Sequence, residues 1–364
     1  MVKIDLAGAI GVYVVGLEEG GLRVRDKIII AVDAMGGDNA PADIVKGCVQ
    51  ALANKNMKDD IHIKLFGFGD IVQMELDKYD YDNKCIELIH APEVIEMNES
   101  PTKAVRTKQN SSMIMAMQAV KDSNADALVS AGNSGALLAG ATSIIKRIKG
   151  IERPVLGTPL PNAKGVTFLV DSGANMDCKP SYLVQFAKMG SIYMEYVHRK
   201  KAPRVALINV GVERGKGNAL TKEVYELLEA ESGINFIGNI EARDIPKGEC
   251  DVAVCDAFVG NVILKYTEGM ASSLMGMIKE ELMSSTISKI GAMMAKGAFV
   301  SLKKRFDYAE IGGAPFLGLK KIVIKAHGSS DHRAIRNAIY QAYIFASLEL
   351  CEEIEESCLG DMHV

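Results

Sequence analysis

Residues 126–140 read DALVSAGNSGALLAG and combine the features that decide the fold. An apolar run comes first, a loop of Gly132, Asn133, Ser134 and Gly135 follows, and small residues suited to a helix close the stretch. A strand that leads through a short turn into a helix is the repeating unit of a parallel α/β sheet. The loop has almost no side-chain bulk, so its backbone N–H groups are open to an anionic ligand.

The same alternation of strand and helix recurs along the chain. Segments 112–121 and 181–198 have the apolar spacing of helices, and short β-rich runs lie between such segments. Strands are expected at 27–33, 61–67, 86–90, 126–131, 166–171, 204–210, 235–238, 251–256 and 321–326. Parallel strands with right-handed crossovers predict a three-layer α/β/α sandwich, Rossmann-like, with a mainly parallel sheet.

Two segments depart from this alternation. Residues 267–305 have a long, Met-rich helical pattern, interrupted at 284–286, which predicts a pair of helices projecting from the sandwich. Residues 334–355 predict a single amphipathic helix that packs on the body. We therefore expect one α/β/α domain over 27–364, preceded at 1–26 by an appended leader or an extra strand.

Size and composition indicate a globular protein of the cytoplasm. The 364 residues are 48% hydrophobic and 24% charged, which excludes collagen-like, disordered and disulfide-scaffold classes. A net charge of −4 gives no bulk attraction to nucleic acid or to an anionic membrane. Seven cysteines without a C-x-x-C pair indicate reduced thiols, and no metal site is expected. The apolar stretch 4–17 is too short to span a bilayer.

Loops rich in small and amide residues follow six of the expected strands. They cover 33–41, 131–135, 171–180, 209–218, 256–261 and 326–331. Because the carboxyl ends of parallel strands meet helix N-termini at one edge of a sheet, we expect these loops to converge on an anion such as phosphate. Each loop alone could equally be a tight turn. None matches a Walker loop or a dinucleotide fingerprint, so neither ATP nor NAD is supported and no cofactor is expected.

Several polar residues in these loops are candidates for catalysis. His327 follows an apolar strand and is either a structural histidine or an acid–base group beside an anion. Lys179 is either a solvated lysine or a compact cation for phosphate at a helix start. Asp33, Asp171 and Asp256 close their strands in matching positions, where an aspartate often only caps the next helix.

Read in order, the loops resemble the PlsX family, the phosphate acyltransferases of bacterial phospholipid synthesis. The motifs that carry the resemblance are AVDAMGGDNAP (31–41), SAGNSGAL (130–137), RPVLGTPLP (153–161), NVGVERGKGN (209–218), NIEARD (239–244), FVGNVILK (258–265) and KAHGSSD (325–331). Together they cover nearly the whole chain after residue 26. The resemblance implies a fold similar to that of phosphotransacetylases and isopropylmalate-type dehydrogenases, usually as a homodimer.

The implied reaction transfers a long-chain fatty acyl group from acyl carrier protein to inorganic phosphate. Its product, acyl phosphate, would serve the glycerol-3-phosphate acyltransferase that follows in phosphatidic acid synthesis. We expect catalytic roles for His327, Lys179 and Asn218, with His327 protonating the departing thiolate and no covalent acyl-enzyme. Phosphate or substrate binding is expected of residues at the strand ends, namely Asp33, Gly36, Gly37, Asp38, Gly132, Asn133, Ser134, Gly135, Asn175, Gly260, Asn261, Lys265, Ser329 and Ser330.

The projecting segment has an apolar face bordered by basic residues. The apolar residues are Ile287, Ile290, Met293, Met294 and Phe299. Such a face is a core or dimer contact, or the tip of a peripheral membrane protein, as the resemblance also implies. The basic residues around it suit anionic lipid headgroups or the acidic carrier protein equally.

Three other functions remain open from the sequence. The first is a phosphotransacetylase that acts on acetyl-CoA, which activity with carrier-protein thioesters would separate from the reaction above. The second is a metal-dependent dehydrogenase of the same fold, which would bind a nicotinamide and lose activity with a chelator. The third is a membrane-associated scaffold, which phosphate-dependent release of carrier-protein thiol would exclude.

Overall fold

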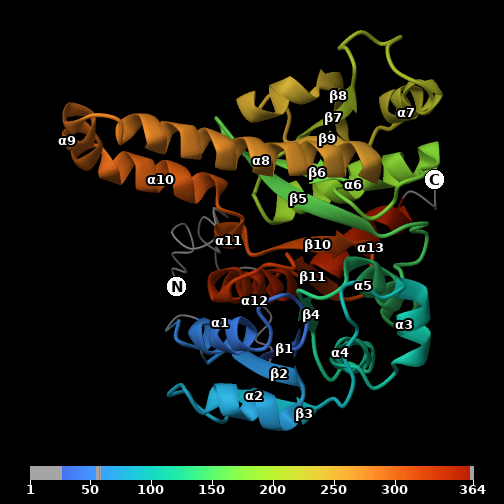
Figure 1. Cartoon of the computed structure of the whole chain (residues 1–364). Helices are drawn as coiled ribbons and strands as arrows, with labels where there is room; N and C mark the ends of the chain where they lie inside the picture. The colour runs from blue at the N-terminus through green and yellow to red at the C-terminus, as the bar shows by residue number, and fades with distance from the viewer. Residues whose placement is uncertain (1–26, 55–56, 58, 361–364) are drawn as a thin grey trace.

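The computed structural model describes residues 27–54, 57 and 59–360, so the expected leader at 1–26 lies outside the described residues. In this part of the chain, eleven strands form one sheet in the order β3-β2-β1-β4-β11-β10-β5-β6-β9-β7-β8 (Figure 1). Their bounds are β1 (Ile28–Asp33), β2 (Ile61–Gly67), β3 (Ile86–His90), β4 (Ala127–Ser130), β5 (Val155–Asn162), β6 (Gly165–Val170), β7 (Arg204–Asn209), β8 (Asn235–Glu241), β9 (Val252–Val254), β10 (Gly313–Leu317) and β11 (Ile322–Ala326).

Helices cover both faces of this sheet, which confirms the three-layer α/β/α sandwich. They are α1 (Ala42–Leu52), α2 (Gly69–Leu76), α3 (Pro101–Thr107), α4 (Ser112–Lys121), α5 (Ser134–Gly140), η1 (Ala141–Ile145), α6 (Pro180–Tyr196), α7 (Ala219–Ala230), η2 (Ala242–Lys247), α8 (Ala257–Leu282), α9 (Thr286–Met294), α10 (Lys296–Phe306), α11 (Tyr308–Ile311), α12 (His332–Ser347) and α13 (Leu350–Gly360). The apolar faces of α1, α6 and α12 share one continuous core on the same side. On the opposite side two separate cores lie under α4 and α8.

Each half of the sheet is internally parallel, but the two halves run in opposite directions. Strands β1, β2, β3, β4 and β11 are parallel to one another, as are β6, β7, β8 and β9. Between them, β10 pairs antiparallel with β11, β5 pairs antiparallel with β10, and β6 pairs antiparallel with β5. Three reversals in succession leave β6 antiparallel to β11.

The two connecting strands, β5 and β10, are the ones that the sequence pattern did not indicate. β5 contains Pro159 and Pro161, and β10 contains Pro315, and a proline within a run argues against a central strand because it has no N–H to donate. The structure resolves this conflict by letting β5 and β10 diverge. They pair only at Leu156 and Val155, so the prolines of β5 lie where the strand has no neighbour on the β10 side.

This reversal corrects the expectation that six strand ends share one edge of a single parallel sheet. The loops after β1, β4 and β11 lie together, whereas those after β6 and β9 form a second group. Residues of both groups line one cavity, together with residues of β5 and β10. The expectation fails because β5 and β10 pair antiparallel with their neighbours, so the strands on the two sides of them point in opposite directions.

The expectation of a single helix over 334–355 is also corrected. The helix α12 ends at Ser347 and α13 begins at Leu350. Between them Glu349 has a φ of +51°, in the left-handed region, which interrupts a right-handed helix. Apolar periodicity continues across the break, so the pattern alone does not reveal it.

The Met-rich segment forms an arm that leaves the body. Figure 1 shows α8 and α10 side by side, extending away from the sheet, with α9 at the far end. The first turns of α8 are packed on the body, since Ala257 and Gly260 are buried. No residue of α9 is buried. Among the described residues, no helix is both long enough and apolar enough to cross a membrane.

Candidate active site

The loops after β1, β4 and β11 are packed tightly against one another. A Cβ on Gly36 would lie 2.6 Å from the backbone nitrogen of Gly132, and one on Gly37 would lie 2.8 Å from the carbonyl oxygen of Gly328. Gly37 also has a φ of +99°, which disfavours any L side chain. These glycines are therefore required for the close approach of three loops.

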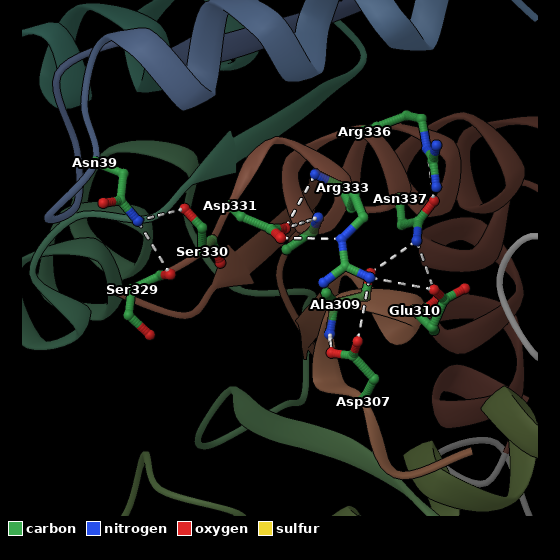
Figure 2. A network of polar contacts seen from close by, with 11 residues as sticks. Asn39, Asp307, Ala309, Glu310, Ser329, Ser330, Asp331, Arg333, Arg336 and Asn337 are labelled. Atoms are coloured by element: carbon green, nitrogen blue, oxygen red, sulfur yellow. Dashed lines mark hydrogen bonds and ion pairs between the residues drawn. The ribbon is translucent and has the colours of Figure 1, made fainter. Parts of the chain in front are cut away.

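Asn39 joins two of these loops from outside. Its Nδ2 donates to the carbonyl oxygens of Ser329 and Ser330, each at 3.2 Å (Figure 2). The next residue, Asp331, caps the N-terminus of α12. Its carboxylate accepts hydrogen bonds from the backbone nitrogen of Ala334 and from Nε of Arg333, both at 3.0 Å. The second half of the β11 loop is thus fixed by Asn39 and by the cap that Asp331 forms.

Asp33 lies behind these loops as a buried carboxylate. It accepts hydrogen bonds from Ser112 Oγ at 2.6 Å and from Ser130 Oγ at 2.7 Å. Burial raises the pKa of Asp33, while these hydrogen bonds and the positive charge of Lys325 oppose that rise. Its neighbours hold it in place, so it shapes the site from behind.

The second group of loops is organised by Asp171, the residue after β6. Its carboxylate accepts from the backbone nitrogens of Gly173, Ala174 and Asn175, at 2.8 to 2.9 Å, and from Asn175 Nδ2 at 2.7 Å. Gly260 in α8 touches the same turn, because a Cβ there would lie 1.8 Å from the Asp171 carbonyl oxygen. Asn175 and Gly260 therefore position α8 on the end of β6.

A cavity of about 440 Å³ lies where the two groups of loops meet. Its polar lining includes six of the residues expected from the sequence, namely Asp38, Ser134, Asn261, Lys265, His327 and Ser329. Its apolar lining comes from the diverging strands and from the arm, and includes Leu156, Pro159, Leu160, Pro161, Leu264, Ala271 and Ile311. This volume is typical of a site for a small organic ligand, and the mixed lining suits a molecule with one anionic and one apolar part.

His327 and Lys265 approach each other across this cavity. His327 Nε2 lies 3.5 Å from Lys265 Nζ, and His327 Nδ1 lies 2.8 Å from Ser329 Oγ. Lys265 also pairs with Glu268 at 2.8 Å. Burial and the positive charge of Lys265 lower the pKa of His327, so its imidazole is neutral at neutral pH. A neutral imidazole can accept a proton, which is the property that an acid–base group needs.

Lys325 is a cavity residue that the sequence reading quoted within a motif but did not single out. It lies in β11, it is 7% exposed, and it lines the cavity. Burial lowers the pKa of its ammonium to about 8, against the opposing effects of Asp33 and Asp38. The sequence signal that could have identified it is a lysine inside the apolar run IVIKA, because burying a charge is costly unless the charge is paired.

Thr158 and Ser172 are two further cavity residues that the sequence analysis did not single out. Their hydroxyls lie 2.8 Å apart in the cavity lining.

Other expected site residues have side chains that are already engaged. Asn133 caps α5 by accepting from Ala136, and its Nδ2 donates to the carbonyl oxygens of Glu96, Met97 and Glu99. A Cβ on the neighbouring Gly135 would lie 2.6 Å from a side-chain carbon of Pro101, so that glycine serves packing. Ser330 is buried, and its Oγ has no hydrogen-bond partner among the described residues.

Two of the three expected catalytic residues lie elsewhere. Lys179 is exposed at the N-cap position of α6. Asn218 is exposed at the N-cap of α7, where its Oδ1 accepts from the backbone nitrogen of Thr221 at 2.9 Å. Neither is among the described residues that line the cavity, whereas His327 is. The sequence could not separate them because all three follow a strand.

Comparison with known proteins places this chain in a family. A family model described as "Fatty acid synthesis protein" matches residues 28–353. A phosphate acyltransferase of Clostridium botulinum is 52% identical over 335 residues, which cover 92% of this chain and 98% of that protein. The chain belongs to this family of phosphate acyltransferases, which is of the PlsX type. A phosphate acyltransferase of Clostridium acetobutylicum is 50% identical and covers 90% of this chain and 98% of that relative.

Solved structures of two phosphotransacetylases share the fold of this chain. A phosphotransacetylase from Streptococcus pyogenes superimposes with a TM-score of 0.57 at 17% identity, over 90% of this chain and 94% of that one. The EutD phosphotransacetylase from Staphylococcus aureus gives 0.55 at 17% identity, over 88% and 94%. At this identity the likeness establishes the fold alone. The PlsX-type family membership makes this chain a transferase that passes an acyl group to phosphate.

Proposed function

We propose that the donor is the thioester of a long-chain fatty acid on acyl carrier protein and that the product is acyl phosphate for phosphatidic acid synthesis. The observation that carries the proposal is the cavity, in which His327, Lys265 and Ser329 share one space with Leu160 and Leu264. The polar groups suit phosphate and the thioester carbonyl, and the apolar groups suit the first methylenes of an acyl chain.

The chemistry follows from the reactants. A phosphate oxygen attacks the thioester carbonyl, the carbon–sulfur bond breaks, and the electron pair leaves with sulfur. Hydrogen phosphate brings one O–H, and the carrier-protein thiolate needs one proton. His327, held neutral by burial and by Lys265, accepts the phosphate proton and delivers it to sulfur, so that no net proton is gained or lost. Donors such as Asn261 and the cation of Lys265 stabilise the oxyanion of the tetrahedral intermediate.

The deciding experiment measures release of carrier-protein thiol with a thiol reagent. Acyl carrier protein loaded with a long-chain acyl group is mixed with the purified chain at increasing concentrations of inorganic phosphate. We expect thiol release that saturates with phosphate and yields hydroxylamine-sensitive acyl phosphate. Acetyl-CoA and long-chain acyl-CoA serve as alternative donors. Thiol release without phosphate, or release only from acetyl-CoA, would contradict the proposal.

We further propose that the chain is cytoplasmic and rests on the membrane by α9. Ile287, Met293 and Met294 in α9 are 84%, 76% and 86% exposed, and Lys289 lies among them. Apolar side chains bordered by basic ones insert into the headgroup region of an anionic bilayer. A tip of this kind would bring acyl phosphate to the surface where its consumer, a glycerol-3-phosphate acyltransferase, acts.

We also propose that the chain forms a homodimer, through a surface on α8 and not through α9. One face of α8 exposes Phe258, Val262, Tyr266, Met270 and Leu274 at intervals of four residues. A second copy would bury such a continuous apolar stripe by isologous contact. Sedimentation of the chain with and without Val262→Asp and Tyr266→Asp tests this interface directly.

A further inference from the structure

Lys325 is a buried cation to which no carboxylate among the described residues is bound. Its Nζ donates to the carbonyl oxygen of Ala131 at 3.1 Å and to that of Ala326. Asp33 acts on it electrostatically, but the carboxylate of Asp33 accepts its side-chain hydrogen bonds from Ser112 and Ser130 instead. Among the described residues, Lys325 therefore has backbone acceptors and no carboxylate as an ion-pair partner.

This arrangement is costly unless an anion enters from the cavity. Burying an ammonium costs several kilocalories per mole unless its charge is matched. An ammonium has three N–H groups, two of which are used by the two carbonyls, so one remains for a ligand. Lys325 lines the cavity together with Gly328 and Ser329, whose loop adds neutral donors on the same wall.

We propose that Lys325 binds the inorganic phosphate of the reaction, with Nζ donating to a phosphate oxygen. The inference rests on the proposed function, because it assigns the phosphate subsite of the same cavity. A phosphate bound to Lys325 would lie beside His327, which is within the electrostatic influence of Lys325 and is the group that takes the phosphate proton. Bound there, the phosphate supplies the negative charge that the buried ammonium lacks.

Asp38 is expected to make the same subsite select orthophosphate over sulfate. Asp38 lines the same cavity, and it acts electrostatically on Lys325. A carboxylate repels a fully ionised anion but accepts a hydrogen bond from the O–H that orthophosphate brings into the site, before His327 takes that proton. Sulfate has no such O–H. The subsite is therefore expected to take orthophosphate in preference to sulfate.

The test compares Lys325→Met with Lys320→Met, which removes an exposed lysine just before the same strand. Isothermal titration with orthophosphate should show Kd raised about ten- to a hundredfold by Lys325→Met, as for a lost charge-assisted hydrogen bond, and unchanged by Lys320→Met. In the thiol-release assay KM for phosphate should rise likewise, while KM for the acyl donor should stay within about twofold. Sulfate should compete weakly with wild type and better with Asp38→Asn.

The outcomes separate this inference from the proposed function. A wild-type chain without phosphate-dependent thiol release overturns the proposed function. An active wild type whose Lys325→Met variant binds orthophosphate normally, or whose two KM values rise together, overturns only the role of Lys325. If Lys325→Met does not fold, a crystal structure of wild type with orthophosphate decides. A phosphate oxygen about 3 Å from Nζ is expected, and phosphate elsewhere, or none, overturns the inference.

Discussion

Two glycines of one helix, Gly260 and Gly269, test how α8 is seated on the body. Both lie in α8, but their surroundings differ. An added Cβ at Gly260 would be 1.8 Å from the Asp171 carbonyl oxygen, whereas at Gly269 no described atom outside the adjoining turns of α8 lies within 4 Å. The same substitution, glycine to alanine, therefore probes the packing of the helix at one position and helix propensity alone at the other.

The magnitudes follow from these distances. Gly260→Ala forces backbone apart by about 1 Å, because real Cβ atoms essentially never approach closer than 3.0 Å. Overpacking of this kind destabilises by about 1–3 kcal/mol, and sometimes more. Moving Asn261 and Lys265 by a comparable distance is expected to reduce turnover about a hundredfold. Gly269→Ala should instead increase the free energy of unfolding by about 1 kcal/mol and leave turnover within about twofold of wild type.

The assays are urea unfolding followed by circular dichroism, after a check that refolding restores the native spectrum, and the thiol-release rate. The quantities to compare are the differences between the two variants in free energy of unfolding and in turnover. If Gly260→Ala is as stable and as active as Gly269→Ala, the helix does not rest on the end of β6 and the cavity wall that it provides is misplaced.

Three further outcomes are expected. His327→Ala should reduce turnover about a hundredfold or more while Lys179→Ala, outside the cavity, loses far less, and steady-state rates with equal losses would contradict this placement. Ile290→Asp with Met294→Asp should abolish sedimentation with anionic vesicles and spare activity in solution, so undiminished vesicle binding would remove α9 from the membrane. Burial, with a smaller effect of Lys200, lowers the pKa of His198 to about 4. Protonation therefore favours the unfolded chain, and the free energy of unfolding should fall between about pH 6.5 and 4, by at most about 1.4 kcal/mol per pH unit from this group. In urea titrations His198→Gln should flatten that slope.

Local patterns in the sequence determined much of this protein. The strands over 61–67 and 86–90 and the helix over 112–121 were predicted at their observed bounds, because apolar periodicity and short turns are local properties. Asp38, Ser134 and His327 were expected in the site because each follows a strand. The motifs in these loops also carried the resemblance to the family that the comparisons confirm.

Only the tertiary structure decided which candidates meet. Lys179 and Asn218 lie in loops that follow strands, as His327 does, yet they are not among the described residues that line the cavity, although Ser172 and Gly173 of the Lys179 loop are. Three antiparallel pairings, of β11 with β10, β10 with β5 and β5 with β6, reverse the strand direction in the middle of the sheet. The short pairing of β5 with β10 leaves Pro159 and Pro161 in the cavity lining. Lys325 acquired its importance through burial between strands that are far apart in the sequence. Strand order, strand direction and the solvation of a charge depend on contacts between distant residues, and no local periodicity encodes them.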